Sequence, residues 1–156
     1  MSNSIDARLA ELGITIPEAA APAANYVPTV VTGNLLFISG QLPNENGKVA
    51  VTGIVGSEVD VAGAQRAAEL CAINIIAQAK AALGGDLSRI KRFVKLTSFV
   101  ASAPGFTEQH IVTNGASNLI ASIFGDAGKH ARSAVGLAAL PFNGSVEIEA
   151  IIEIDA

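Results

Sequence analysis

Arg132 and two glutamates near the C-terminal end have side chains suited to anion binding and proton transfer. Arg132 lies in a run where small or apolar residues alternate with polar ones, and a second alternating run over 145–153 contains Glu147 and Glu149. The segment 140–144 between the runs holds Pro, Asn and Gly, which favour a turn. Two neighbouring strands joined in this way place a guanidinium beside one or two carboxylates. Such a pair is able to hold a small organic acid and to activate a water molecule over it.

The same residues also have a purely structural interpretation. Arg132 is typical of an edge strand, with its aliphatic stem lying along the sheet. Glu147, Glu149 and Glu153 alternate with apolar residues and therefore share one face, which is equally typical of a solvated surface. Both interpretations stay open at this point.

Five further residues are candidates for contacts with a ligand. Ser39 and Gly40 end a β-rich run, where a glycine lets backbone amides approach a ligand but is as common in a turn. The Tyr26 hydroxyl is able to bond a ligand, although a lone tyrosine at the start of a strand is commonly a packing residue. Asn114 and Asn118 lie one helical turn apart, and either could anchor a loop instead.

Residue spacing gives no support for a metal or nucleotide site. His110 and His130 have no matching acidic neighbours, and Cys71 is the only cysteine, so no metal site is predicted. Cys71 falls on an apolar helical stripe and is expected to be an inert core residue. The sequence has no phosphate loop, GxGxxG or GxSxG motif, and no cofactor is predicted.

The composition indicates one globular domain of 156 residues, half of them hydrophobic and only 15% charged. So little charge leaves apolar surface that subunit partners are expected to cover. The net charge of −4 and the scattered basic residues argue against a nucleic-acid partner. A single cysteine, the lack of an apolar run of about 18 residues and the lack of a signal-peptide pattern predict a cytoplasmic protein without a membrane partner.

The elements that must position these residues follow the order β-β-α-β-α-β-β. A short helix over 4–13 and a Pro- and Ala-rich extended segment form an N-terminal extension over 1–24, ahead of a domain over 25–156. The expected elements of the domain are a hairpin with strands over 26–32 and 35–39, a loop over 40–58, a helix over 61–83 capped by Asp60, a strand beginning near Ile90, a helix over 107–124 and two final strands. Both long helices are apolar on one face, so they must cover one side of a single sheet, and subunit association must cover the other.

Two segments at opposite ends of the domain resemble the Rid family, the reactive-intermediate (enamine/imine) deaminases, earlier described as YjgF-like or L-PSP endoribonuclease-like. The first is GNLLFISGQLP over 33–43, and the second combines ARSAV over 131–135 with LP over 140–141 and VEIEA over 146–150. Asn74 and VKLTSFV over 94–100 are also similar. The resemblance covers about 25–154, and the run over 113–132 is similar to a subgroup of longer members.

The resemblance implies an α+β fold like that of chorismate mutase, assembled as a homotrimer around a central barrel with ligand clefts between subunits. It implies that Arg132 holds a substrate carboxylate and that Glu147 activates the attacking water, without a cofactor or metal. The other residues that it places in the cleft are Tyr26, Ser39, Gly40 and either Asn114 or Asn118. Ala134 also falls in the cleft, at a position where typical deaminases often have cysteine.

The activity implied in this way is hydrolysis of reactive 2-imino or enamine acids to 2-keto acids and ammonia. The strongest alternative is a non-catalytic trimeric module that binds small carboxylic or keto acids in the same clefts. The acidic net charge disfavours a ribonuclease. A single candidate arginine gives little support for a chorismate mutase, whose ligand is a dianion. A structural trimer, in which Arg132 and Glu147 form a buried inter-subunit ion pair, also stays open.

Overall fold

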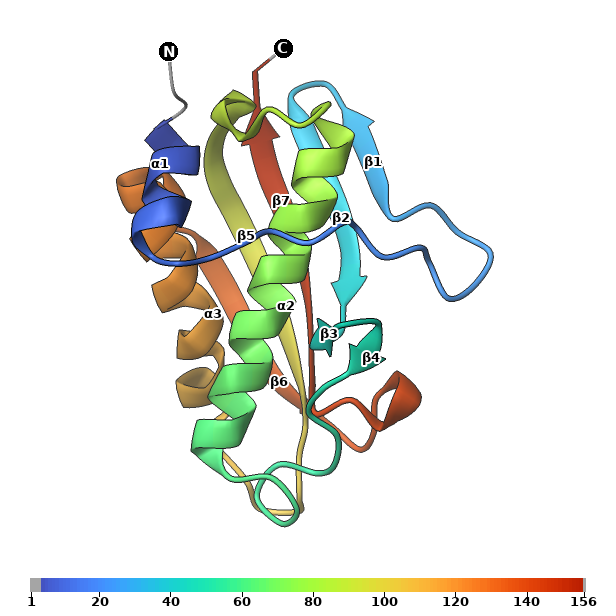
Figure 1. Cartoon of the computed structure of the whole chain (residues 1–156). Helices are drawn as coiled ribbons and strands as arrows, with labels where there is room; N and C mark the ends of the chain where they lie inside the picture. The colour runs from blue at the N-terminus through green and yellow to red at the C-terminus, as the bar shows by residue number, and fades with distance from the viewer. Residues whose placement is uncertain (1–3, 156) are drawn as a thin grey trace.

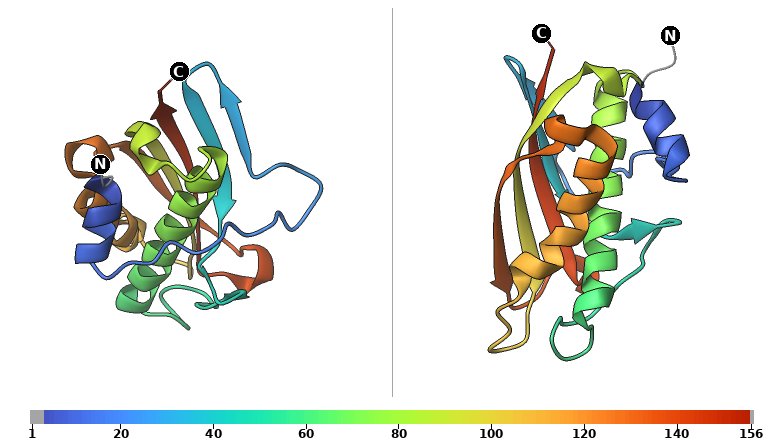
Figure 2. Two further views of the ribbon diagram at one scale, coloured as in Figure 1. Left: turned by 45° about the horizontal axis from the view of Figure 1, so that its top comes forward. Right: turned by 90° about the vertical axis from the view of Figure 1, so that its left-hand side faces the viewer.

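The computed structural model describes residues 4–155 and has a two-layer α+β architecture, with helices on one face of a mixed sheet (Figures 1 and 2). The helices are α1 (Ser4–Glu11), α2 (Val61–Ala82) and α3 (Gln109–Phe124). The strands of the sheet are β1 (Thr29–Thr32), β2 (Leu35–Gln41), β5 (Ile90–Ala101), β6 (Ala131–Leu137) and β7 (Val146–Ile154). Three 3₁₀ turns connect them, η1 (Leu87–Arg89), η2 (Gly125–Gly128) and η3 (Pro141–Asn143). The predicted α+β class, with one main sheet and two long helices, is confirmed.

The long helix α2 forms where its local sequence predicts it. The Asp60 side chain accepts a hydrogen bond from the Gly63 amide at 2.7 Å, which caps the first turn. The apolar stripe is buried against the sheet and α3, and the small residues on it let the layers approach closely. Gly84 and Gly85 follow the helix with φ of 66° and 94°, a conformation that glycine adopts without strain. Within residues 4–155, no helix is long and apolar enough to cross a membrane.

The strand order of the sheet is β1-β2-β7-β5-β6, antiparallel except for the parallel pair of β5 and β6. The prediction that the two final strands are neighbours is wrong, because β5 lies between them. β6 follows β5 through α3, and a crossover of this kind joins parallel neighbours, so β6 takes the outer edge. β7, in which every second residue is buried, fills the centre between β2 and β5.

The region predicted as a loop over 40–58 contains a small additional hairpin. Its strands are β3 (Asn44–Glu45) and β4 (Lys48–Val49), paired antiparallel. Asn46 and Gly47 form the turn with φ of 53° and 78°. An Asn-Gly pair favours such a two-residue turn, so the sequence carried a signal for this hairpin.

The N-terminal segment is tied to the helical layer. α1 lies beside α3, where Leu9 is buried and the Arg8 Nε donates to the Ser122 carbonyl at 2.7 Å. Residues 14–28, called the strap below, then cross over α2 toward β1 (Figure 1). Ile14 and Ile16 at the start of the strap pack against the core.

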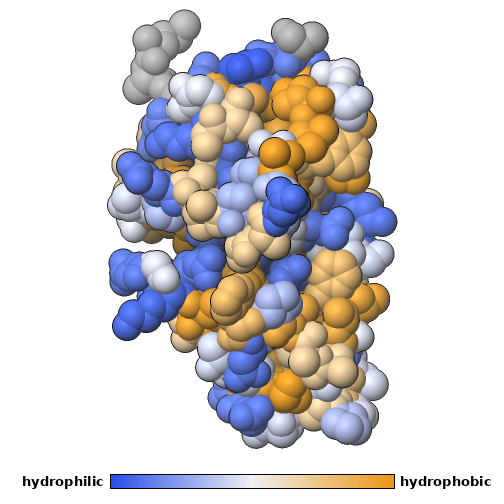
Figure 3. All heavy atoms as spheres, turned by 90° about the vertical axis from the view of Figure 1, so that its right-hand side faces the viewer, coloured by the Kyte–Doolittle hydropathy of each residue, from blue (hydrophilic) through white to orange (hydrophobic). Residues whose placement is uncertain are grey.

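The helices cover one face of the sheet, and no described residue forms a layer on the other (Figure 2). Apolar side chains lie exposed on that open face, since Val30, Phe37 and Val135 are 52%, 40% and 43% exposed. Figure 3 views the molecule from the side of β1 and shows hydrophobic residues over much of it. Large apolar surface of this kind marks a site of association.

Candidate functional site

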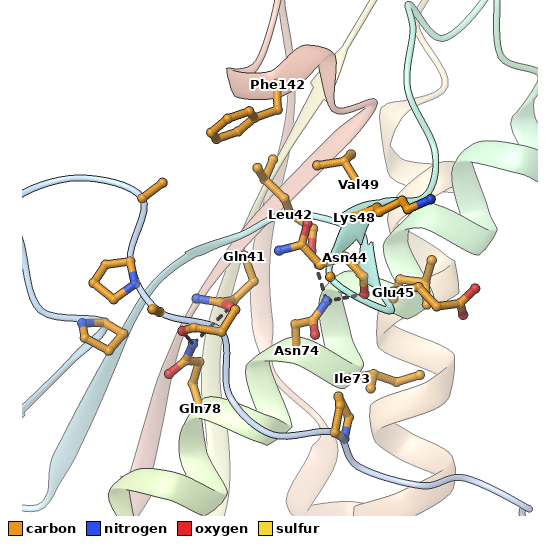
Figure 4. A pocket seen from close by; sticks show the side chains of 18 of the residues that line it. Gln41, Leu42, Asn44, Glu45, Lys48, Val49, Ile73, Asn74, Gln78 and Phe142 are labelled. Carbon is orange, nitrogen blue, oxygen red and sulfur yellow. Dashed lines mark hydrogen bonds between the residues drawn. The ribbon is translucent and has the colours of Figure 1, made fainter.

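A cavity of about 950 Å³ lies at the C-terminal end of β2, between the strap, the β3–β4 hairpin and α2 (Figure 4). Its volume is in the range of small-molecule sites. Three of the predicted ligand residues, Tyr26, Ser39 and Gly40, line it. The strap supplies mostly apolar residues to its wall, including Pro17, Ala20, Ala21, Pro22, Ala23 and Pro28. The N-terminal extension is therefore part of this cavity and not an appendage.

Buried side-chain amides hold the wall of the cavity together. Gln78 Nε2, from α2, donates to the Ala20 carbonyl of the strap at 2.9 Å. One turn earlier on α2, Asn74 Nδ2 donates to the carbonyls of Leu42 at 3.1 Å and Asn44 at 3.0 Å. Figure 4 shows both amides pointing from the helix toward the segments that they bind. Gln78 was not predicted as a site residue, although a second amide one turn from Asn74 on an apolar stripe is a usable signal.

Glu147 lies on the open face of β7, half-buried and directly against Gly40. The pairing of β2 with β7 shifts between Ile38 and Gln41, so Ser39 and Gly40 form a bulge beside the carboxyl. A Cβ on Gly40 would occupy the space that the carboxyl group fills, so glycine at this position lets Glu147 take its present conformation. Burial, and after it the negative charge of Glu149, raises the pKa of the Glu147 carboxyl above its ordinary value. A carboxyl perturbed in this way is a candidate general acid or base.

Cys71 does not supply a nucleophile to this region. Its thiol is fully buried on α2 and donates to the Val146 carbonyl at 3.6 Å. Burial, followed by the charge of Glu147, raises the pKa of the thiol well above its ordinary value, so the reactive thiolate is suppressed. The prediction that Cys71 is a core residue is confirmed.

Arg132 lies on the edge strand β6 and is held by two neutral acceptors on α3. Its Nη1 donates to Ser117 Oγ at 2.9 Å, and its Nη2 donates to the His110 carbonyl at 3.0 Å. No carboxylate of the described residues forms an ion pair with it, in contrast to Arg8, Arg66, Arg89 and Arg92. Arg132 therefore carries a positive charge that has no acidic partner among residues 4–155.

Arg132 and Glu147 do not meet within one chain. β5 separates their strands, and the two side chains lie on opposite faces of the sheet. Arg132 is paired with Leu96, which is buried under the helices, whereas Glu147 is paired with Phe99, three residues further along β5. The expected contact between guanidinium and carboxylate on neighbouring strands is therefore wrong for the single chain.

The remaining predicted residues gather near Arg132. Ala134 follows it by two residues and faces the same side, paired with the buried Ser98. Arg132 contacts positions 110 and 117 of α3, and Asn114 lies between them on that face of the helix. Asn118 is exposed and falls outside this row. Of the two asparagines, Asn114 is therefore the one on the same row of α3 as the two groups that bind Arg132.

The site residues thus form two groups. Tyr26, Ser39 and Gly40 line the cavity and Glu147 lies against Gly40 on the central strand β7, whereas Arg132 and Ala134 lie on the edge strand β6 and Asn114 on the adjoining helix α3. The first group offers a carboxyl and a cavity, and the second offers a cation and an amide. Over residues 4–155, no cluster of three or more His, Cys, Asp or Glu side chains is arranged to hold a metal ion.

Comparison with known proteins gives matches over nearly the whole chain. A family model described as "YjgF/chorismate_mutase-like, putative endoribonuclease" matches residues 6–154. Protein TCP17 of Trypanosoma cruzi is 50% identical over 155 residues, which are 99% of this chain and 96% of TCP17.

Solved structures also match over nearly the whole chain. The protein Atu1372 of Agrobacterium tumefaciens, described as having unknown function, is 66% identical with a TM-score of 0.92, over 97% of this chain and 93% of its own. The E. coli protein TdcF, solved with bound serine, is 26% identical with a TM-score of 0.62, over 89% of this chain and 94% of its own.

Proposed function

The chain belongs to the YjgF (Rid-like) family, as its sequence motifs predicted, and we propose that it hydrolyses reactive 2-imino and enamine acids to 2-keto acids and ammonia. The observation that carries this proposal is the Arg132 guanidinium, which is rigidly held by neutral groups and lacks an acidic partner. A substrate carboxylate is a fitting partner for it. TdcF, a relative with bound serine, shows that a member of the family accepts a small molecule bearing a carboxylate.

Substrate binding in this proposal rests on the geometry of the guanidinium. Two of its five N–H donors are engaged by Ser117 and the His110 carbonyl, and the other three have no acceptor among residues 4–155. A carboxylate bound by two parallel N–H groups is fixed in orientation as well as position. The adjacent imine carbon is then held at a constant place for attack.

Glu147 acts as the base in the proposed reaction. It takes a proton from water while the water oxygen bonds to the imine carbon and the C=N electron pair moves to nitrogen, and it then passes that proton to the nitrogen. In the second step the carbinolamine hydroxyl gives its proton to Glu147 as the C=O bond forms, the C–N bond breaks, and the amino group leaves as ammonia with the proton that Glu147 returns. A carboxyl with a raised pKa suits this role because it is a stronger base and takes the proton from water more readily. The imine is already electrophilic, so the proposal needs no cofactor or metal.

The proposed site is completed by a second subunit. Arg132 and Glu147 lie on opposite faces of the sheet with β5 between their strands, so one substrate contacts both only where the β6 edge of one chain meets the β2 side of another. Head-to-tail contacts of this kind close into a ring, and we propose a homotrimer. The exposed apolar residues Val30, Phe37 and Val135 support burial of the open face in that assembly.

The deciding experiment generates 2-aminoacrylate from serine with a dehydratase and follows the release of pyruvate. We expect the wild-type chain to accelerate release over the uncatalysed reaction. Arg132→Ala should abolish the acceleration, and Arg132→Lys should recover little of it because the fork geometry is lost. Arg89→Ala, which removes only an exposed ion pair with Asp155, is the matched control and should keep full activity. An Arg132→Ala protein with the wild-type rate would show that the assignment is wrong.

A non-catalytic binding module is the second candidate, and the serine bound to TdcF favours it. Binding requires only Arg132 and the neighbouring Asn114, and it makes no demand on Glu147. The two functions separate in one experiment, because a binding module takes up pyruvate or 2-ketobutyrate with an affinity that depends on Arg132 but does not accelerate imine hydrolysis.

A further inference from the structure

A continuous line of hydrogen bonds leads from the turn η2 to the guanidinium of Arg132. His130 Nδ1 lies 2.7 Å from the Gly128 carbonyl, and His130 Nε2 lies 2.8 Å from Ser117 Oγ. Ser117 Oγ in turn accepts from Arg132 Nη1 at 2.9 Å. His130 was not predicted as a site residue because its spacing gives no metal pattern, and Ser117 was not predicted as one either.

With a neutral imidazole, the chemistry of the groups gives each bond in this line one direction. A carbonyl oxygen can only accept, so the proton of the neutral imidazole is on Nδ1 and Nε2 is left as an acceptor. Ser117 therefore donates its single hydroxyl proton to His130 Nε2. The lone pairs of Ser117 Oγ are then free to accept from Arg132, which has only donors.

The residues of this line of hydrogen bonds are held in place by the close packing of α2, α3 and η2. Gly115 lies against the backbone carbonyl of Gln65, with no room for a Cβ, and Gln65 Nε2 donates back to the Ile111 carbonyl at 3.0 Å. These contacts lock α3 to α2. Gly128 is packed in the same way against the backbone carbonyl of Ile120, which fixes η2 on α3. The positions of Ser117 and of the Gly128 carbonyl are therefore set by the fold.

The groups that bind Arg132 are neutral, so they hold its side chain without cancelling its charge. A carboxylate at the Ser117 position would hold the guanidinium equally well but would cancel its charge. A hydroxyl polarised by a neutral imidazole fixes the side chain and leaves the full positive charge for a ligand. The exposed ion pairs of Arg89 and Arg92 show the other arrangement, in which the chain itself supplies the anion.

We propose that Ser117 and His130 are positioning residues that hold Arg132 rigid and uncompensated, so that the β6 edge binds the carboxylate of a small monocarboxylic acid. This inference rests on the proposed function for the identity of the ligand class, but not on catalysis. An ordered arginine loses less rotamer entropy when it binds an anion, so the gain is in affinity. His130 acts through Ser117 and touches no ligand.

The test measures the dissociation constant of pyruvate by NMR titration, together with the melting temperature. We expect Ser117→Ala and His130→Ala to weaken binding by about three- to tenfold, the effect of one lost hydrogen bond, with melting temperatures close to that of the wild type. Ser117→Thr and His130→Gln should restore most of the affinity, because each returns an acceptor in the same place. Ser122→Ala is the control and should bind normally, because Ser122 is on the same helix but its hydroxyl donates to the Asn118 carbonyl and not to Arg132 or His130.

Ser117→Asp separates positioning from charge. It should keep Arg132 ordered through an ion pair and still lose pyruvate binding more severely than Ser117→Ala. The proposal is overturned if Ser117→Ala and His130→Ala bind pyruvate as the wild type does, if Ser117→Asp binds it at least as well as Ser117→Ala, or if the wild type does not bind it at all. Imine hydrolysis is measured separately, so a wild type that binds pyruvate through this line but does not hydrolyse imines contradicts the proposed activity and supports the positioning role.

Discussion

Glu147 is a carboxyl group partly removed from water at a place where the backbone makes room for it. Gly40 in the β2 bulge leaves the space that the carboxyl fills, and Glu149 stands two residues along the same strand. Both surroundings favour the protonated form, and both raise the pKa of Glu147. The residue is thereby suited to accept and return a proton, which is the task that the proposed reaction gives it.

Glu147→Gln should separate catalysis from binding. Glutamine keeps the shape of the side chain but cannot take a proton, so we expect turnover above the uncatalysed rate to fall by about 10²–10⁴-fold. The affinity for pyruvate should change by less than about twofold, because Arg132 and not Glu147 holds the carboxylate. The coupled pyruvate assay and an NMR titration measure the two quantities. Unchanged turnover would point to a different base.

The raised pKa of Glu147 also makes a prediction about stability. A carboxyl whose pKa is higher in the folded chain binds protons more tightly there than in the unfolded chain, so its ionisation opposes folding. The destabilisation is absent at pH below the ordinary glutamate pKa and is complete once the pH exceeds the raised value. Glu147→Gln should therefore raise the melting temperature at pH 7, and the difference should shrink at pH 4. A difference that grows on acidification would contradict the direction of the shift.

At the residue scale, the sequence predicted the chemistry of single side chains better than it predicted which residues contact them. The alternating pattern placed Glu147 and Glu149 on one face, which the structure confirms. It contained no signal for the Ser117 and His130 contacts, because these join residues brought together by the packing of α3 on β6. Partners fixed by tertiary packing do not leave a local periodicity.

At the scale of elements, the features set by short stretches of sequence were predictable. The Asp60 cap, the apolar stripe of α2 and the glycines that end it all act within a few residues. The order of the strands was not predictable in this way. The alternation of apolar and polar residues shows which residues of β7 share a face of the sheet. The same alternation fits a strand beside β6 as well as a strand between β2 and β5. The crossover of β6 through α3 decides between them, and that is a property of the whole chain.

The strap depends on the amide of Gln78 for its place over the cavity. Loss of the bond to the Ala20 carbonyl in Gln78→Ala should loosen residues 14–28 without unfolding the sheet, since a typical hydrogen bond contributes about 1 kcal/mol. We expect amide hydrogen exchange in this segment to become about three- to tenfold faster. Gln65→Ala is the matched control, because Gln65 also extends from α2 to a backbone carbonyl but binds α3 instead. Equal exchange of the strap in both variants would show that Gln78 does not hold it.

At the scale of the whole molecule, the proposed site is divided between two places on the chain. The edge strand β6 carries the cation on the helix side, and the central strand β7 carries the carboxyl on the open apolar face, next to the β2 bulge that borders the cavity. In the proposed ring of three chains, each β6 edge meets the β2 side of the next chain. We therefore expect a mass in solution three times the 15.8 kDa of one chain, measured by light scattering.

Mixed trimers test whether each site takes Arg132 from one chain and Glu147 from another. Arg132→Ala and Glu147→Gln subunits are each inactive alone, but unfolding and refolding them together in equal amounts forms mixed rings. A cleft regains both groups when its arginine comes from the second variant and its glutamate from the first, which random assembly gives in about one cleft in four. Activity should thus return to about a quarter of the wild-type level, whereas a site contained within one chain would recover none. The double variant, refolded with itself and with wild-type chains, is the control for refolding yield.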